Sequence, residues 1–243
     1  MPRSLPRPQA RSGFTLVEML VVIAIIGVLS AMVAPALPSI LESKSVEKAA
    51  AEVSGVLETA RAEAMAKRTY VYVCFVNGTN TQGNSEIRIG ALASLDGTDD
   101  RTAANLRALS KVIKVDRAQI TDYSELSDGM KDAVGRVPSG SGKDLMPDFT
   151  NNADYATDDD FDDQGIAFKD IQGFKNNFEG LTAQVVTITP QGEILDSASP
   201  DFFRRVVHFG IAATRREEID KEADNGAIVT YYGGSGRIGI FRP

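Results

Sequence analysis

The chain opens with a short basic segment that leads directly into a long apolar run. Residues 1–13 contain no acidic residue, and their charged side chains are Arg3, Arg7 and Arg11. In the following run, 14–34, the only charge is Glu18. About 21 helical residues reach about 30 Å, the thickness of a bilayer hydrocarbon core. We therefore predict a transmembrane helix over 14–38, with its N-terminus in the cytoplasm because the arginines precede it.

Two other interpretations of this start are a secretory signal peptide and a simple uncleaved anchor. A signal peptide has a shorter apolar core followed by a small-residue cleavage site. Ala34-Pro35-Ala36 lies in that place, but the proline disfavours cleavage and Gly13 is left without a role. Neither alternative explains Glu18. Inserting a carboxylate into the membrane costs about 2.5 to 3.5 kcal/mol at the centre of a helix and less toward its ends, so Glu18 calls for a partner.

The segment Gly13-Phe14-Thr15-Leu16-Val17-Glu18, followed by the apolar run, resembles the class III signal of type IV prepilins and type II secretion pseudopilins. The resemblance implies that a prepilin peptidase cuts between Gly13 and Phe14 and that Phe14 is then N-methylated. It implies that Glu18 pairs with the N-terminal amine of a neighbouring subunit, and that Pro35 is the helix-kink position. The partners implied are other pilins or pseudopilins, the peptidase and an inner-membrane assembly platform.

Pairing of Glu18 with an amine is also sensible on physical grounds. An isolated carboxylate in a low dielectric is costly, whereas an amine four residues away along a neighbouring helix would neutralise it. Such a pair fixes the axial offset of two subunits and so specifies assembly.

Beyond Pro38 the pattern becomes amphipathic, and it predicts one helix from about Ser39 to Lys67, within a segment 39–68 that enters the head. Apolar residues recur at spacings of three and four, at Ile40, Leu41, Val46, Ala49, Ala50, Val53, Val56, Leu57, Ala60 and Ala64. A solvated coiled-coil stalk is the alternative, but the many alanines favour close packing against a sheet.

The strand signals predict a β-rich head over 69–243. The predicted strands are 69–76, 183–189, 193–195, 204–209, 227–232 and 237–241, with turns at 78–80, 190–192 and 233–236. Residues 77–180 are interpreted as a variable insertion, with a helix around 103–109 and a strand around 111–115. The fold class is thus α+β, a long N-terminal helix on an antiparallel sheet, and most of the sheet is expected from the end of the chain.

Three later segments resemble the minor pseudopilins of the GspH/FimT type. They are the run from Ala60 to Arg68 leading into a strand, Thr189-Pro190-Gln191-Gly192, and Gly236-Arg237-Ile238-Gly239-Ile240. The resemblance implies a scarce filament subunit with a periplasmic head on an inner-membrane anchor.

The composition of the chain limits which binding and catalytic sites it can form. With 33 acidic and 26 basic residues the net charge is −7, which makes a general nucleic-acid surface unlikely to form. Cys74 is the only cysteine, which excludes an intrachain disulfide and indicates a buried thiol in an apolar strand. His208 is the only histidine and is interpreted as structural, because no second histidine or cysteine accompanies it.

A calcium site is a weaker candidate. Asp160, Asp162 and Gln164 have the alternate spacing that opens an EF-hand loop, but the twelfth position is Ile171 instead of glutamate. A solvated acidic loop is the better interpretation, although some pseudopilins bind calcium in their heads.

Arginines gather late in the chain, at Arg204, Arg205, Arg215, Arg216, Arg237 and Arg242. They indicate either the DNA-binding region found in some FimT-like minor pilins or an ordinary charged sheet rim. The sequence thus leads to three hypotheses: a minor pseudopilin of a type II secretion-like machine, a minor pilin that binds DNA or a surface, and a membrane-anchored enzyme. The enzyme hypothesis has no catalytic constellation behind it.

Overall fold

The computed structural model describes residues 14–33, 37–121, 126–130, 166, 168–178, 181, 183–196, 199–203, 206–215, 218–219 and 225–242. The chain divides into two compact units, residues 1–40 and 41–243.

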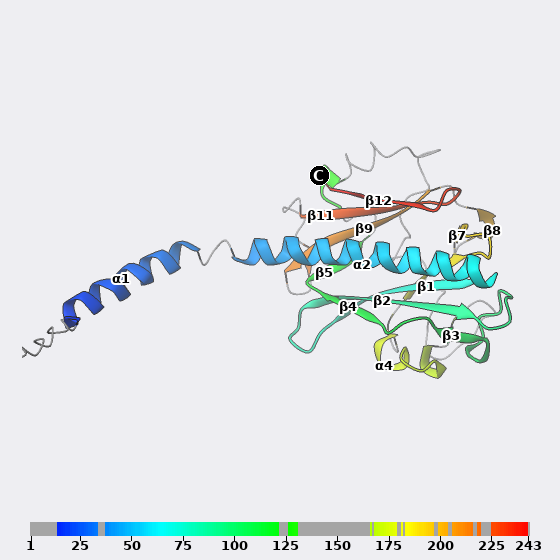
Figure 1. Cartoon of the computed structure of the whole chain (residues 1–243), viewed down its shortest axis with the longest axis horizontal. Helices are drawn as coiled ribbons and strands as arrows, with labels where there is room; N and C mark the ends of the chain where they lie inside the picture. The colour runs from blue at the N-terminus through cyan, green and yellow to red at the C-terminus, as the bar shows by residue number, and fades with distance from the viewer. Residues whose placement is uncertain are drawn as a thin grey trace, which may run out of the picture. The chain divides into compact units, whose positions relative to one another are not determined.

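The first unit contains the helix α1, Leu16–Val33, which is 18 residues long (Figure 1). Its exposed apolar side chains include every position from Met19 to Ile23. Because consecutive helical residues point in different directions, all sides of α1 are apolar and open. In the part of the chain that the structure describes, no helix is both long and apolar enough to cross a membrane. Pro35 lies outside the described residues.

The helix α2, Leu37–Lys67, is the longest element and enters the head. It begins two residues before the predicted Ser39 and ends at the predicted Lys67, so the amphipathic pattern located it correctly. From Val46 onward the positions predicted to face a sheet are buried, among them Ala49, Val53, Leu57, Ala60 and Ala64, whereas Leu41 is 47% exposed.

The described residues of the head form two antiparallel sheets. The seven-stranded sheet has the order β3-β2-β1-β6-β7-β8, and β4 pairs with β2 beside β3. Its strands are β1 Val71–Thr79, β2 Ser85–Ser94, β3 Leu106–Ala108, β4 Ile113–Asp116, β6 Ala183–Ile188, β7 Ile194–Asp196 and β8 Ser199–Phe203.

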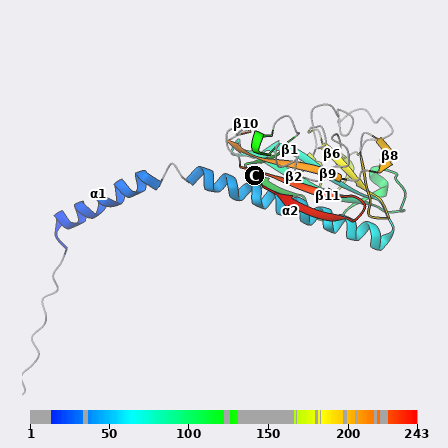
Figure 2. The ribbon, with the colours of Figure 1, turned by 90° about the horizontal axis from the view of Figure 1, so that it is seen from above.

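The five-stranded sheet has the order β10-β9-β11-β12, and β5 pairs with β9. Its strands are β5 Ala118–Thr121, β9 Val206–Arg215, β10 Glu218–Ile219, β11 Gly226–Tyr232 and β12 Arg237–Phe241. Figures 1 and 2 show α2 running along both sheets. The predicted α+β class, with a long helix on antiparallel sheets, is therefore confirmed.

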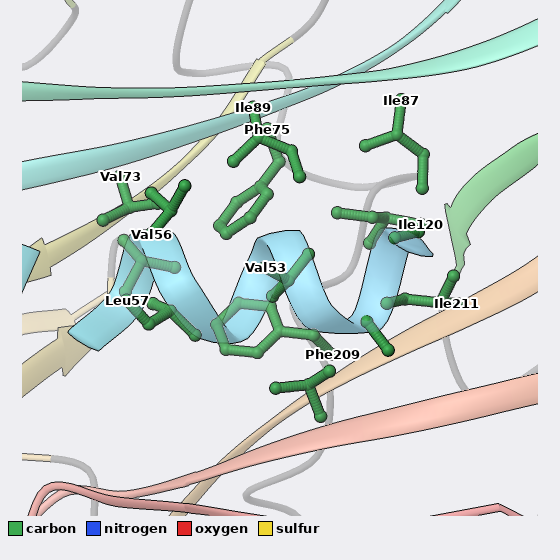
Figure 3. Close-up of a cluster of buried hydrophobic side chains, with 14 of the residues drawn as sticks. Val53, Val56, Leu57, Val73, Phe75, Ile87, Ile89, Ile120, Phe209 and Ile211 are labelled. Carbon is green, nitrogen blue, oxygen red and sulfur yellow. The ribbon is translucent and has the colours of Figure 1, made fainter. Parts of the chain in front are cut away.

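One apolar core is shared by α2 and the two sheets (Figure 3). Val53 and Leu57 of α2 lie among side chains of both sheets, and Phe75 of β1 meets Phe209 of β9 with ring centroids 5.2 Å apart. Each buried aliphatic or aromatic side chain of this kind stabilises the fold by about 1.5 to 3 kcal/mol. The helix and both sheets consequently depend on the same buried surface.

The sheets are joined where β4 leads into β5 through a single residue, Arg117, at φ 59°. The Arg117 amide donates to Ser85 O at 2.7 Å, and its carbonyl accepts the Thr214 amide at 3.2 Å. The side chain of Asn77 adds a second link, because it donates to Ile120 O at 2.7 Å and accepts from Ile120 N at 3.0 Å.

The outer face of the seven-stranded sheet has its own core, covered by η3 Phe168–Asp170 and α4 Lys175–Phe178. Phe168, Phe174 and Phe178 stack on one another with centroids 4.9 to 5.9 Å apart. Phe174 also covers Gly90 so closely that a Cβ there would collide with its ring.

Several details of the sequence prediction are wrong. The turn expected at 78–80 comes later, because β1 continues to Thr79 and the Asn80 side chain organises the turn by accepting the amides of Gln82 and Asn84. The helix expected at 103–109 is only the short η2, Ala103–Asn105, followed by β3, because Leu106–Ala108 pairs with β2.

The first half of the chain contributes more strands than expected. β2 was not predicted at all, yet it pairs with β1 from Ser85 to Ala93, and β2 to β5 all precede residue 122. The expectation that most of the sheet comes from the end of the chain is nevertheless confirmed for the described residues, because seven of their twelve strands, β6 to β12, follow residue 182. The strand expected at 111–115 is β4, Ile113–Asp116, and the strand expected at 204–209 continues as β9 to Arg215.

Candidate functional site

The first turn of α1 carries a reciprocal set of hydrogen bonds between Thr15 and Glu18. The Thr15 amide and the Thr15 hydroxyl both donate to Glu18 Oε2, each at 2.9 Å. The Glu18 amide donates back to Thr15 Oγ1 at 3.2 Å. The first helical bond, from Met19 N to Thr15 O at 3.2 Å, places Thr15 as the residue that caps the helix.

This arrangement is a capping box, in which a threonine and a glutamate three residues later satisfy each other's amides. It matters because the first four N–H groups of a helix have no partner within the helix. The carboxylate is also favourably placed against the positive end of the helix dipole. Glu18 is therefore held at the end of α1 by local chemistry.

The Glu18 carboxylate can accept a further donor. Both bonds from Thr15 end on Oε2, and each oxygen of an ionised carboxylate has two lone pairs. Phe14 lies directly before Thr15 and is 79% exposed. Of the predicted assembly residues, Phe14 and Glu18 thus lie near the same helix end, while Gly13 lies outside the described residues.

The role of Thr15 is the part of this site that the sequence analysis missed. The signal was present, because Thr15-Leu16-Val17-Glu18 has the spacing of a capping box before an apolar run.

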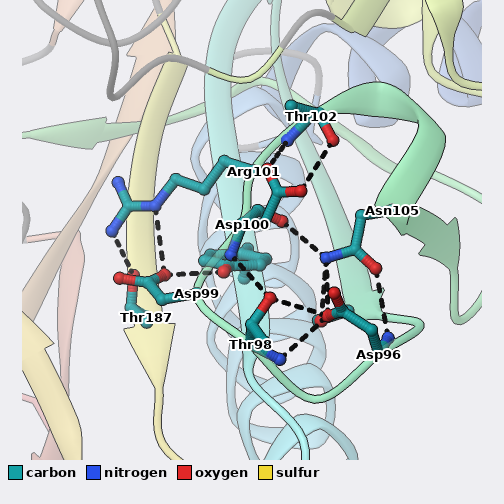
Figure 4. Close-up of polar contacts among 10 residues, drawn as sticks. Asp96, Thr98, Asp99, Asp100, Arg101, Thr102, Asn105 and Thr187 are labelled. Atoms are coloured by element: carbon teal, nitrogen blue, oxygen red, sulfur yellow. Dashed lines mark hydrogen bonds and ion pairs between the residues drawn. The ribbon is translucent and has the colours of Figure 1, made fainter.

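The loop after β2 contains a cluster of polar side chains that contact one another (Figure 4). Asp96 Oδ1 accepts four hydrogen bonds, from the Thr98 amide at 2.9 Å, the Thr98 hydroxyl at 2.7 Å, the Asn105 amide group at 2.8 Å and the Ser94 hydroxyl at 3.0 Å. The bond from the Thr98 amide is the main reason that the pKa of Asp96 lies well below its usual range. The carboxylate oxygen is thus occupied by the loop itself.

A second set of contacts attaches this loop to the sheet. The Tyr72 hydroxyl donates to Asp99 Oδ1 at 2.6 Å, and Arg101 both pairs with Asp99 at 3.3 Å and lies over the Tyr72 ring. Burial and the hydrogen bond to Asp99 raise the pKa of Tyr72. These contacts fix the loop in place and give it a structural role.

Within the described ranges, no group of three or more histidine, cysteine or acidic side chains is arranged to hold a metal ion. The predicted calcium ligands Asp160, Asp162 and Gln164 lie outside the described residues.

His208 and Cys74 are both buried. His208 on β9 lies with Nδ1 2.8 Å from the Thr230 hydroxyl of β11, in agreement with the structural role predicted for it. Cys74 is a free thiol inside the outer core, so its predicted burial is confirmed.

The late arginines are only partly brought together. Arg215 contacts the buried Glu42 of α2 at 3.4 Å, and Arg237 and Arg242 are exposed at the two ends of β12. Arg204, Arg205 and Arg216 lie outside the described residues.

Comparison with known proteins adds evidence at the N-terminus and across half of the chain. Residues 8–34 match the family model of the prokaryotic N-terminal methylation motif, which implies a membrane-anchored filament subunit. Two curated relatives, both named fimbrial protein and both from Pseudomonas aeruginosa, are 27% identical over 132 residues, 50% of this chain and 84% of each relative. No solved structure matches the chain.

The matched motif contains the capping box of α1, and the fimbrial relatives cover residues well beyond it. The chain therefore carries a prokaryotic N-terminal methylation motif and is type IV pilin-like.

Proposed function

We propose that the chain is a minor pseudopilin, a structural subunit of a type II secretion-like pseudopilus. In this role a prepilin peptidase removes residues 1–13 by cutting between Gly13 and Phe14, and Phe14 is N-methylated. Glu18 then pairs with the N-terminal amine of a neighbouring subunit. The observation that carries the proposal is the arrangement of Phe14, Thr15 and Glu18 at the start of a helix whose only charged residue is Glu18.

The capping box is compatible with cleavage. Cutting before Phe14 converts the Phe14 nitrogen into an amine but leaves the Thr15 nitrogen in a peptide bond. The bonds from Thr15 to Glu18 Oε2 are therefore retained in the mature chain. Thr15 would orient the carboxylate at the helix end, beside the place where a new amine is created, and Oε1 would remain available to the incoming subunit.

The surface of α1 requires a cover. Its large apolar side chains are exposed, as at Leu16, Ile23 and Met32, which are 80%, 65% and 71% exposed. Such a surface is stable against lipid or against the equivalent helices of other subunits. We propose that the apolar run 14–34 anchors the chain in the inner membrane in a single pass with the head in the periplasm, and later packs in the filament.

In this proposal the head has a structural role and catalyses no reaction. Its partners in the proposal are other pilins or pseudopilins, the peptidase and the inner-membrane assembly platform. Calcium binding at Asp160, Asp162 and Gln164 stays a prediction.

A minor type IV pilin with a role in adhesion or DNA uptake is the second candidate. The observation that favours it is the similarity to two proteins named fimbrial protein. Deleting the gene distinguishes the two candidates, because loss of a pseudopilin retains secreted enzymes inside the cell, whereas loss of a pilin reduces adhesion or DNA uptake.

The assembly role is tested by intact-mass measurement of the protein extracted from membranes. We expect a chain that begins at Phe14 and carries one additional methyl group. Glu18→Ala should leave the cleaved mass unchanged but strongly reduce incorporation into filaments, because the pairing carboxylate is lost. Glu47→Ala, an exposed change on α2, is the matched control and should assemble normally.

A chain that begins elsewhere than Phe14 would contradict the proposed processing. Normal filament incorporation of Glu18→Ala would contradict the proposed pairing.

A further inference from the structure

Arg61 of α2 is enclosed by two glycine turns that come from different sheets. Gly192 lies in the turn between β6 and β7 at φ 80°, and Gly236 lies in the turn between β11 and β12 at φ 64°. A Cβ at Gly236 would collide with the Arg61 guanidinium, and one at Gly192 would lie 3.0 Å from Arg61 Nε and 2.8 Å from Met65 Sδ. The three segments that resemble minor pseudopilins thus meet at one place, which we name the Arg61 patch: Arg61, Met65, Gly192 and Gly236.

The two turns enclose Arg61 but provide no hydrogen-bond acceptor for its Nε. Arg61 Nε is buried and has no hydrogen-bond acceptor in the described part of the chain. The Gly192 carbonyl is already used, because it accepts the Tyr231 hydroxyl at 2.9 Å. The turn amides also have partners, Gly192 N with Thr189 O at 2.8 Å and Gly236 N with Tyr232 O at 2.6 Å.

Nearby carboxylates of the same chain do not supply the acceptor. Glu63 is bound by Lys67 at 2.6 Å and by Arg107. Glu58, three residues before Arg61, is exposed, and within the described residues no ion pair joins it to Arg61. Nε is enclosed by the turns, so an acceptor from outside must meet the two terminal nitrogens of the guanidinium. These carry four of its five donors in one rigid plane, which matches the geometry of a carboxylate.

The patch is also partly apolar. Met65, four residues after Arg61 on the same helix face, is 47% exposed and touches Gly192. A fixed arginine beside an exposed methionine has the composition of a protein contact, because arginine and methionine are both enriched at interfaces. In Figure 1 the C-terminal end of α2 lies at the same end of the head as β7 and the turn between β11 and β12.

We propose that the Arg61 patch binds an acidic side chain of a neighbouring filament subunit, with the guanidinium forming a bidentate pair to the carboxylate and Met65 covering it. Charge favours this occupant, because the chain has 33 acidic and 26 basic residues, so a second copy of this chain, as the neighbouring subunit, offers an excess of carboxylates. Since the occupant is a filament subunit, this inference rests on the proposed function.

Arginine footprinting tests the contact directly. The full chain is treated with phenylglyoxal, once as the free subunit in detergent and once in isolated filaments, and modified arginines are mapped by mass spectrometry. We expect Arg61 to react in the free subunit and several-fold less in filaments. Arg237, exposed on the same hairpin, should react equally in both and is the internal control.

Variants of Arg61 distinguish a role in binding another subunit from a role in stabilising the two turns. Arg61→Lys retains the charge and most of the stem but loses the planar fork, and Arg61→Gln loses the charge. We expect both to lower filament incorporation several-fold, by more than any change in thermal melting accounts for. Arg237→Gln should incorporate normally.

Each result decides between the two proposals. A chain that does not enter filaments at all would overturn the assembly role and the Arg61 contact together. A chain that enters filaments while Arg61 stays fully reactive would overturn the contact alone, as would variants whose loss of assembly only follows their loss of stability. Protection of Arg61 by duplex DNA added to the free subunit would also overturn the assignment to a carboxylate.

Discussion

In this head the side chain of Asn77 makes hydrogen bonds that a backbone usually makes. Its amide donates to and accepts from the same residue, Ile120, as a neighbouring strand would. Ile120 is 2% exposed, so its backbone groups have little access to water that might replace Asn77. One of the hydrogen-bonded links between the two sheets thus depends on a single side chain.

Replacing Asn77 by alanine should therefore destabilise the head by about 2 kcal/mol, because buried backbone groups would lose their partners. Chemical denaturation of the full chain measures the change. Gln82→Ala, an exposed amide in the turn after β1, is the control and should change the free energy of unfolding by less than about 0.5 kcal/mol. Equal effects of the two changes would contradict the role given to Asn77.

We expect the stability of the head to depend on pH because the thiol of Cys74 is buried. Burial raises the pKa of its thiol, so the folded chain keeps the proton at a pH where the unfolded chain loses it. Stability is fully present below the unfolded pKa of about 8.5 and is lost as the pH rises above it, by about 1.4 kcal/mol per pH unit. Denaturation between about pH 8 and 9, which lies below the pKa of about 10 of unfolded tyrosines, measures the onset of this loss.

Cys74→Ala is the matched variant, because it removes the titrating group and retains a small apolar side chain. Its free energy of unfolding should change little with pH over the same range. A slope of the same size in both proteins would assign the effect to other groups.

At the level of elements, the sequence predicts those parts whose structure is determined locally. The three-and-four spacing located α2, and alternating or β-branched runs located β6, β11 and β12, because each pattern directly records which face is buried. The Gly-Phe junction and Glu18 were found for the same reason, since the motif is contiguous. Even Thr15 could have been recognised from its spacing to Glu18.

Elements determined by distant contacts were missed. β2 contains Gly90, Ala91 and Ala93, which have low strand propensity, but Gly90 is required because Phe174 lies against it. Likewise, Leu106–Ala108 is a strand because β2 pairs with it, against a helical composition. No local pattern reports that Arg61 meets Gly192 and Gly236, which are more than a hundred residues away in the chain.

At the scale of the whole head, α2 is the element that both sheets share. Val53 and Leu57 lie in one core with Val73 and Phe75 of the first sheet and with Phe209 and Ile211 of the second (Figure 3). Hydrogen bonds at Arg117, Asn77 and Tyr231 also connect the two sheets. We therefore expect the two sheets to unfold together, because neither retains its buried face without the helix.

Leu57→Ala tests this directly. Leu57 is fully buried, so truncation should destabilise the head by about 2 to 5 kcal/mol, the transfer and cavity cost of a buried leucine. Hydrogen exchange should show β1 and β11 losing protection by the same amount, because one cooperative transition opens both. Glu58→Ala, the exposed neighbour, should leave both strands unchanged. Loss of protection in only one sheet would mean that the two sheets have separate stabilities, and that α2 supports them independently.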